Sequence, residues 1–123
     1  MNPPAWTITI NSHVPSTVYA TTRSDGVFRS LDGGYTWNDI STGLTTPSAR
    51  VMGRSAPVRT LYVGSEGGGV FKSRDGGDYW FAVNSGLNDL SVYALVMDPR
   101  KTAVLYAGGP NGVSKTLTGG RRR

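Results

Sequence analysis

The sequence predicts an all-β repeat protein built from four-stranded antiparallel units, and three observations support this prediction. A Ser-x-Asp-x-Gly-x-Thr-Trp pattern at 30–37 returns with one change at 73–80, 43 residues later. Without any gap, 11 of the 27 residues at 18–44 are identical to their counterparts at 61–87. The chain contains 17 Gly and 7 Pro and has no long helical periodicity, which favours short strands joined by tight turns.

The first unit spans residues 1–44 and sets the pattern for the others. Apolar and polar residues alternate at its start, as in a half-buried strand. Its four strands are expected at 6–10, 17–21, 26–30 and 35–40. Between the last two, Asp32-Gly33-Gly34 predicts a tight hairpin, because Gly accepts the positive φ that such a turn needs.

The second unit spans 45–90, the third spans 91–120, and a basic tail follows at 121–123. In the second unit the segment 50–55 is taken as the counterpart of 7–12. The other strands of the second and third units are expected at 60–64, 69–73, 78–83, 91–97, 103–108 and 112–115. The third copy stops before its Trp, so the chain holds eleven strands, or about two and three-quarter units.

The residues of the two repeated patterns are expected to fasten turns. An Asp carboxylate or a Ser hydroxyl there can bond to the backbone N–H groups of its own turn, and a Trp can fill the gap between packed sheets. One Asp per repeat lacks the additional ligands of a metal site. The residues assigned this structural role are Ser30, Asp32, Gly34, Thr36, Trp37, Ser73, Asp75, Gly77 and Trp80.

These patterns resemble the Asp-box repeats, also called bacterial neuraminidase repeats, although Tyr79 replaces Thr in the second. The longer stretches 67–77 and 92–99 are similar to the blades of sialidases, xyloglucanases, sortilin-type receptors and photosystem II assembly factors. The resemblance implies a β-propeller, with the boxes as structural hairpins away from the binding face. It also favours an extracellular or cell-surface location. A propeller closes with roughly 4–8 blades, so this chain is expected to belong to a longer protein or to assemble from copies.

Composition excludes several other classes of function. The net charge is +5, but the last three Arg supply +3 of it, and the remaining basic residues are scattered, which argues against a nucleic-acid partner. Cysteine is absent, so no disulfide or thiolate metal site is expected. No apolar run approaches the roughly 20 residues of a membrane span, and residues 1–4 do not resemble a signal peptide. No cofactor is expected.

No catalytic set can be assigned from the sequence. The resemblance to sialidases would require an arginine triad, a Tyr nucleophile and a paired Glu, yet Glu66 is the only Glu and the Arg residues occupy dissimilar places in the repeats. Xyloglucanase-like hydrolysis needs two carboxylates across a cleft. Candidates for these exist only by elimination: Asp25, Asp39, Asp78, Asp89 and Asp98. His13 is the lone His and has no evident Ser, Cys or metal partner.

Blade topology sorts the loops onto two faces, because hairpins alternate between them. The box turns share one face with the loops 11–16, 56–59 and 98–102, and the remaining turns and blade connections lie on the other. In the families that the chain resembles, ligands meet that second face. The residues expected to bind a carbohydrate or protein ligand there are Arg23, Asp25, Glu66, Asp89 and Asn111.

The leading hypothesis is a non-catalytic structural or interaction module that self-associates into a ring or filament, or that belongs to a larger propeller. An incomplete propeller leaves apolar side chains uncovered, such as Ile8, Val18, Phe28 and Trp37. Large exposed apolar patches are unusual on soluble monomers, so a homo-oligomer is expected. The alternative is a fragment of a glycan-binding or glycoside-hydrolysing propeller.

Overall fold

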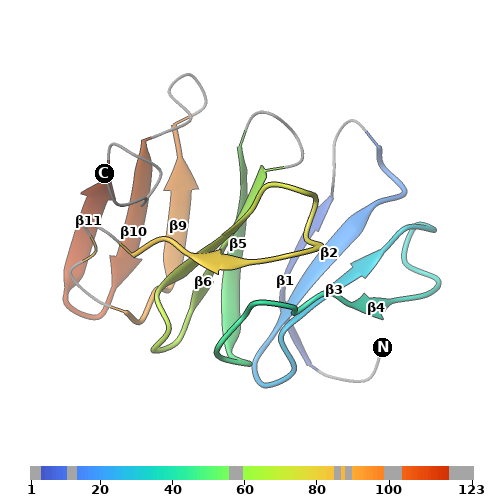
Figure 1. Ribbon diagram of the computed structural model, residues 1–123, viewed down its shortest axis with the longest axis horizontal. Helices are drawn as coiled ribbons and strands as arrows, with labels where there is room; N and C mark the ends of the chain where they lie inside the picture. Colours follow the sequence, from blue (N-terminus) through green and yellow to red (C-terminus); the bar gives the residue numbers. More distant parts are fainter. Residues whose placement is uncertain are drawn as a thin grey trace.

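Three antiparallel sheets make up the part of the chain that the computed structural model describes, residues 4–10, 14–55, 60–84, 87, 90–98 and 104–116 (Figure 1). Two sheets have four strands and one has three, and no helix lies within these ranges. The expected all-β architecture of antiparallel four-stranded units is therefore confirmed. The expected strand of the third unit at 103–108 begins at residue 105 in the structure, and residue 103 is outside the described ranges.

Each sheet is one blade, with its strands in sequence order from one edge to the other. Blade 1 contains β1 (Ala5–Ile10), β2 (Val18–Thr22), β3 (Val27–Ser30) and β4 (Asn38–Asp39). Blade 2 contains β5 (Ala49–Ser55), β6 (Thr60–Ser65), β7 (Val70–Ser73) and β8 (Phe81–Ala82). Blade 3 contains β9 (Ala94–Met97), β10 (Leu105–Gly109) and β11 (Gly112–Thr116).

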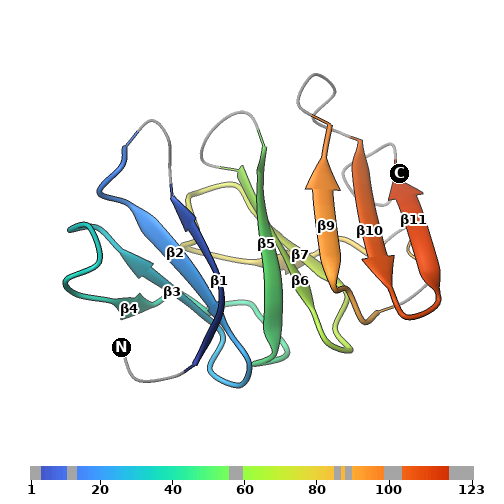
Figure 2. The same cartoon turned by 180° about the vertical axis from the view of Figure 1, so that it is seen from behind.

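The blades stack side by side, with the first strand of each blade next to the first strand of the following one. Figure 2 shows β1, β5 and β9 in this row, and β5 is in contact with both of the others. This is the arrangement of neighbouring propeller blades, in which the first strands line the central axis. Blade 2 lies in the middle and is covered by a blade on either side.

Two apolar cores hold the three blades together. The core between blades 1 and 2 contains Tyr19, Val27, Ile40, Ala49, Met52, Leu61, Val63, Phe71 and Trp80. The core between blades 2 and 3 contains Tyr62, Val70, Val83, Val92, Leu95, Leu105 and Ala107. Every residue of β6 is buried, because one face of this strand packs against blade 1 and the other against blade 3. Stacking of repeats thus supplies the core that no single blade has.

The outermost strands are shorter than the sequence predicts. Strands were expected at 35–40 and 78–83, but β4 and β8 have two residues each. The reason lies in the repeated turn pattern: the Asp32 carboxylate accepts a 2.8 Å bond from the Thr36 N–H, which keeps this segment in a turn. Ladder pairing with β3 starts only at Asn38, opposite Arg29.

The inner strands also differ from the expected alignment, by one residue. In blade 1, Ile8 pairs with Ala20, and in blade 2 the residue at this place is Met52, which pairs with Val63. The counterpart of Ile8 is therefore 44 residues away, not 43. Both strands carry an irregularity at the same place, between Ala5 and Thr7 and between Ala49 and Val51, so Arg50 corresponds to Trp6.

Candidate functional site

The first of the two repeated patterns, residues 30–37 and called the first box below, is a turn closed by its own side chains. The Ser30 hydroxyl donates to the Asp32 carboxylate at 2.7 Å and accepts from the Gly34 N–H at 2.8 Å. The other Asp32 oxygen accepts from the Thr36 hydroxyl at 2.5 Å. Gly33 and Gly34 have φ of 75° and 102°, which is the positive φ that the hairpin requires.

The second box repeats this geometry around Asp75. Ser73 donates to the Asp75 carboxylate at 2.7 Å and accepts from the Gly77 N–H at 2.9 Å. The Tyr79 N–H replaces that of Thr36 as a donor to the carboxylate, at 3.1 Å. The sequence expectation that both Asp side chains bond within their own turns agrees with these contacts.

These hydrogen bonds favour the charged form of both carboxylates. Bonds from the Thr36 hydroxyl, the Thr36 N–H and the Ser30 hydroxyl lower the pKa of Asp32 from 3.8 to about 2. The pKa of Asp75 is also lowered, chiefly by the Ser73 hydroxyl. A carboxylate stabilised as an acceptor in a turn is suited to fasten that turn, and a lowered pKa is the opposite of what a general acid needs.

The second box additionally joins two blades. The Gly76 carbonyl accepts bonds of 3.0 Å from the Tyr19 hydroxyl and from the Arg29 guanidinium, both on blade 1. Arg29 also forms a 3.0 Å ion pair with Asp78. These contacts fix the position of the box turn of blade 2 on the face of blade 1.

The outer face of blade 1 is open. Ile8 and Ile10 are 66% and 55% exposed on it, and Phe28 and Trp37 are half-buried. The expectation that Val18 is also uncovered is wrong: it is 9% exposed, because it lies on β2, between β1 and β3 of its own blade. The corresponding face of blade 2 is covered by blade 1: Met52, the counterpart of Ile8, is 8% exposed, and Trp80 is fully buried. Ile8 and Trp37 are thus more exposed than their counterparts in blade 2, which has a neighbouring blade on this face.

The outer face of blade 3 is open in the same way. Val96, Val113 and Tyr106 are 60%, 71% and 37% exposed on it. By strand register Tyr106 and Val113 correspond to Tyr19 and Val27 of blade 1. Those two counterparts are almost fully buried against blade 2. The outer faces of blades 3 and 1 therefore correspond to the two surfaces that meet where blade 1 packs on blade 2.

Four of the residues expected to bind a ligand lie on turns at the ends of the strands. Arg23 and Asp25 are exposed on the turn between β2 and β3, and Asn111 is exposed on the turn between β10 and β11. Glu66, between β6 and β7, is half-buried and pairs with Arg50. Asp89 lies outside the described residues. The hypothesis of a shared binding site at these positions stays a prediction.

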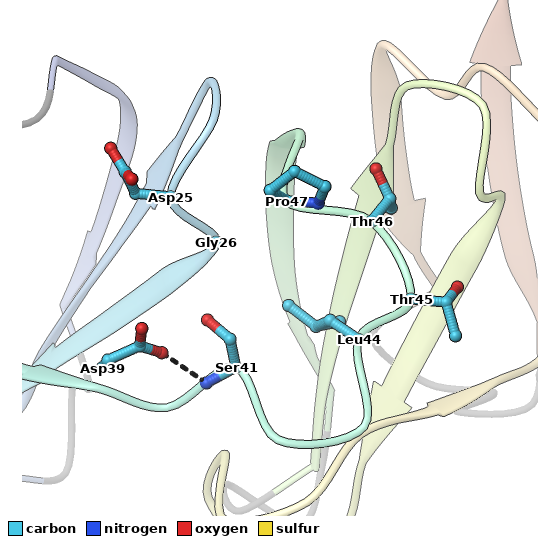
Figure 3. Close-up of a pocket in the computed structure, with 8 residues that line it drawn as sticks. All are labelled: Asp25, Gly26, Asp39, Ser41, Leu44, Thr45, Thr46 and Pro47. Atoms are coloured by element: carbon cyan, nitrogen blue, oxygen red, sulfur yellow. Dashed lines mark hydrogen bonds between the residues drawn. The ribbon is translucent and has the colours of Figure 1, made fainter.

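Asp25 lies at the rim of a shallow depression of about 390 Å³ beside the connection between blades 1 and 2 (Figure 3). Its other lining residues are Gly26, Asp39, Ser41, Leu44, Thr45, Thr46 and Pro47. In Figure 3 the two carboxylates lie on one side and the connection from Leu44 to Pro47 on the other. Asp39 accepts a 2.8 Å bond from the Ser41 N–H, which fixes this carboxylate at the rim.

A second polar cluster lies on the inner strands. The Arg50 guanidinium carbon is 4.7 Å from the centre of the Trp6 ring and 4.3 Å from that of the Tyr93 ring. Its Nη1 lies 3.4 Å from a Glu66 carboxylate oxygen. One side chain from each blade therefore stacks in a row, and the cationic member is favoured between two aromatic faces. The sequence does not reveal this row, because the one-residue shift in the inner strand hides the correspondence of Trp6 and Arg50.

Other site types receive no support from the part of the chain that the structure describes. Within the described ranges no three His, Cys, Asp or Glu side chains are grouped so that they could hold a metal ion. Among the same residues, no helix is long and apolar enough to cross a membrane.

Comparison with solved structures shows that the fold is that of β-propeller blades. The chain is similar to an ancestral GH74 enzyme, with a TM-score of 0.78 and 19% identity over 94% of this chain and 17% of that one. It is similar to the GH74 xyloglucanase from Xanthomonas campestris, with a TM-score of 0.71 and 16% identity over 95% of this chain and 22% of that one. It is also similar to YCF48 from Cyanidioschyzon merolae, with a TM-score of 0.67 and 16% identity over 97% of this chain and 37% of that one.

The chain spans less than two-fifths of the length of each of these proteins. No protein-family model matches the chain, and no curated protein matches its sequence. At identities below one fifth the likeness establishes the propeller fold and leaves activity open.

Proposed function

We propose that this chain is a structural interaction module, a set of propeller blades at 1–44, 45–90 and 91–120 that associates with further copies of itself into a ring or filament, or that packs against further blades as part of a larger propeller. The proposal assigns it no catalytic residue. It starts from the fold that the comparisons establish, a stack of propeller blades shorter than the propellers it resembles.

One observation carries this proposal: Ile8 is 66% exposed where its counterpart Met52 is 8% exposed. Burial of apolar surface stabilises by about 25 cal/mol per Å², so covering the face around Ile8 would be favourable. Burial of the exposed Val113 on the outer face of blade 3 would be favourable for the same reason. An uncovered apolar face on a repeat array calls for a capping element or a neighbour, and no polar cap lies on either face within the described residues.

A second copy of the chain fits these faces because they are complementary. The face of blade 3 carries the Tyr and Val that blade 1 presents to blade 2, and the face of blade 1 carries the Phe and Trp that receive them in blade 2. The two surfaces differ from each other, so the contact runs head to tail. Such contacts give a closed ring or an open filament, according to the rotation between copies.

Hydroxyl-radical footprinting at rising protein concentration tests the proposal. Oxidation of Ile8 and Val113 should fall as copies associate, while oxidation of Leu90 should not change. Leu90 is a matched control, because it is an exposed apolar side chain, at 48%, on the connection between blades 2 and 3. Oxidation of Ile8 and Val113 that stays constant up to high micromolar concentration would refute self-association.

The depression beside Asp25 supports a second candidate function, binding of a glycan. Paired carboxylates at the rim of a depression suit hydrogen bonding to sugar hydroxyls, and one of the similar structures is a xyloglucanase. Titration with xyloglucan oligosaccharides would test it. If the depression binds the glycan, Asp25→Asn should weaken binding. Asp98→Asn, a control at a residue outside the depression, should leave binding unchanged.

A further inference from the structure

We propose that two copies dock with the geometry of the contact between blades 1 and 2, so that Tyr106 of one copy reaches the first Asp-box turn of the next. This inference rests on the proposed self-association and names the residues that make the contact. The acceptor is the Gly33 carbonyl, and the flanking pair is Lys115 of one copy with Tyr35 of the other.

The contact inside the chain supplies the template. The Tyr19 ring is buried against blade 2, and its hydroxyl donates a 3.0 Å bond to the Gly76 carbonyl of the second box. Beside it, Arg29 bonds to the same carbonyl and pairs with Asp78. A Tyr and a cation from one blade therefore meet the box turn of the next blade.

Blade 3 presents the same pair of donors at its open face. Tyr19 is opposite Arg29 in the ladder of β2 and β3, and Tyr106 is opposite Lys115 in the ladder of β10 and β11. The Lys115 ammonium lies 5.6 Å from the centre of the Tyr106 ring, so the two side chains are already together. In blade 2 the corresponding pair, Tyr62 and Lys72, lies 5.3 Å apart by the same measure.

Blade 1 presents the matching acceptor. Gly33 and Gly76 both have a φ of 75°, and the hydrogen bonds from Ser and Asp are shared by the two boxes. The Gly33 carbonyl therefore has the same place in its turn as the Gly76 carbonyl, on a box that no blade covers.

One position differs between the template and the proposed contact. Asp78, which pairs with Arg29, corresponds to Tyr35, which is 90% exposed. Lys115 would thus meet an aromatic ring in place of a carboxylate, and a cation near the face of a Tyr ring is an attractive pair. The Tyr35 ring, which is exposed on its own blade, would be covered in this contact.

Single-cysteine cross-linking tests the docking mode, since the natural chain has no Cys. Tyr35→Cys and Lys115→Cys are prepared separately and treated with a short bis-maleimide, alone and as an equimolar mixture. The double variant Arg29→Cys/Asp78→Cys is the positive control, because its intramolecular link shows that the reagent spans this contact. The geometry predicts a dimer of linked chains in the mixture and none in either variant alone.

The outcomes separate the docking mode from the association itself. Linked dimers in one variant alone, or no linked dimer in the mixture, would overturn the head-to-tail geometry while footprinting still reports association. Absence of both linked dimers and footprinting protection would remove the proposed function as well.

Tyr106→Phe provides a second measurement that keeps the fold intact. Loss of one hydroxyl bond should raise the dissociation constant between copies about threefold to tenfold. Tyr93→Phe, directly before β9 and stacked on Arg50, is the matched control and should leave it unchanged. Equal dissociation constants for Tyr106→Phe and the natural chain would refute the assigned bond.

Discussion

Trp37 and Trp80 stand at the same position of two repeats, yet their surroundings differ. Trp80 is fully buried and donates its indole N–H to the Ile40 carbonyl of blade 1 at 2.7 Å. Trp37 is half-buried and donates at 2.9 Å to the Gly34 carbonyl of its own turn. The box turn is the same in both cases, and only the neighbouring blade is added or missing.

This difference separates two roles of the repeated turn. The hydrogen bonds from Ser and Asp are local and form in both boxes, so they stabilise the hairpin itself. The Trp indole and the Gly carbonyl instead bond to another blade when one is present. The first box thus has a formed turn and an unused contact surface.

Replacing each Trp by Ala should give the largest contrast between the two boxes. Trp80→Ala should lower the free energy of unfolding by about 3–5 kcal/mol, because it empties the core between blades 1 and 2. Trp37→Ala should cost about 1–2 kcal/mol in dilute solution, since that side chain is only partly buried. Urea unfolding of both variants measures the difference, and equal losses would show that blade 1 has a covered outer face.

Replacing a box Gly by Ala tests the same contrast with a smaller effect. Gly34 and Gly77 both have positive φ, so Ala should cost about 1–2 kcal/mol of strain at either site. A Cβ on Gly77 would in addition lie 2.5 Å from the Ile40 methyl of blade 1, whereas one on Gly34 would meet only Trp37 at 3.8 Å. Gly77→Ala should therefore cost about 1–3 kcal/mol more than Gly34→Ala.

Thermal unfolding checks this order. If Gly34→Ala proves at least as damaging as Gly77→Ala, the close approach of the second box to blade 1 is wrong.

The smallest effect concerns acid sensitivity, which the two boxes should share. The pKa of Asp32 is lowered in the folded chain from 3.8 to about 2, so the folded state favours the carboxylate. Its contribution to stability is present above pH 3.8 and is lost as the pH falls toward about 2. Asp32→Asn should flatten the loss of stability in that window, and Asp75→Asn should act in the same direction.

Urea unfolding between pH 5 and 2 measures this effect, and Asp25→Asn, at an exposed turn outside the boxes, is the control. An Asp32→Asn variant with the acid profile of the natural chain would contradict the turn-fastening role.

The repeat made much of the fold predictable. Identical residues at a constant spacing identify the box turns, their positive-φ glycines and the faces of β2, β3, β6 and β7, because each of these depends on local chemistry. The ends of β4 and β8 were not predictable, since a side-chain bond from Asp32 to Thr36 delays the ladder. The row of Trp6, Arg50 and Tyr93 depends on a strand irregularity that the sequence does not reveal.

The candidate binding residues were less predictable than the fold. The sequence places Arg23, Asp25, Glu66 and Asn111 on turns, but it does not contain the distances between those turns. Glu66 proved to be the partner of Arg50, and Asp25 alone of the set lines the depression.

Multi-angle light scattering over a dilution series tests the central claim most directly, because it reports the mass of the native particle without any substitution. The exposed faces around Ile8 and Val113 predict a particle of two or more chains at micromolar concentration, dissociating on dilution. Far-ultraviolet circular dichroism on the same samples confirms that the chains are folded. A folded particle with the mass of one chain throughout the series would contradict the account.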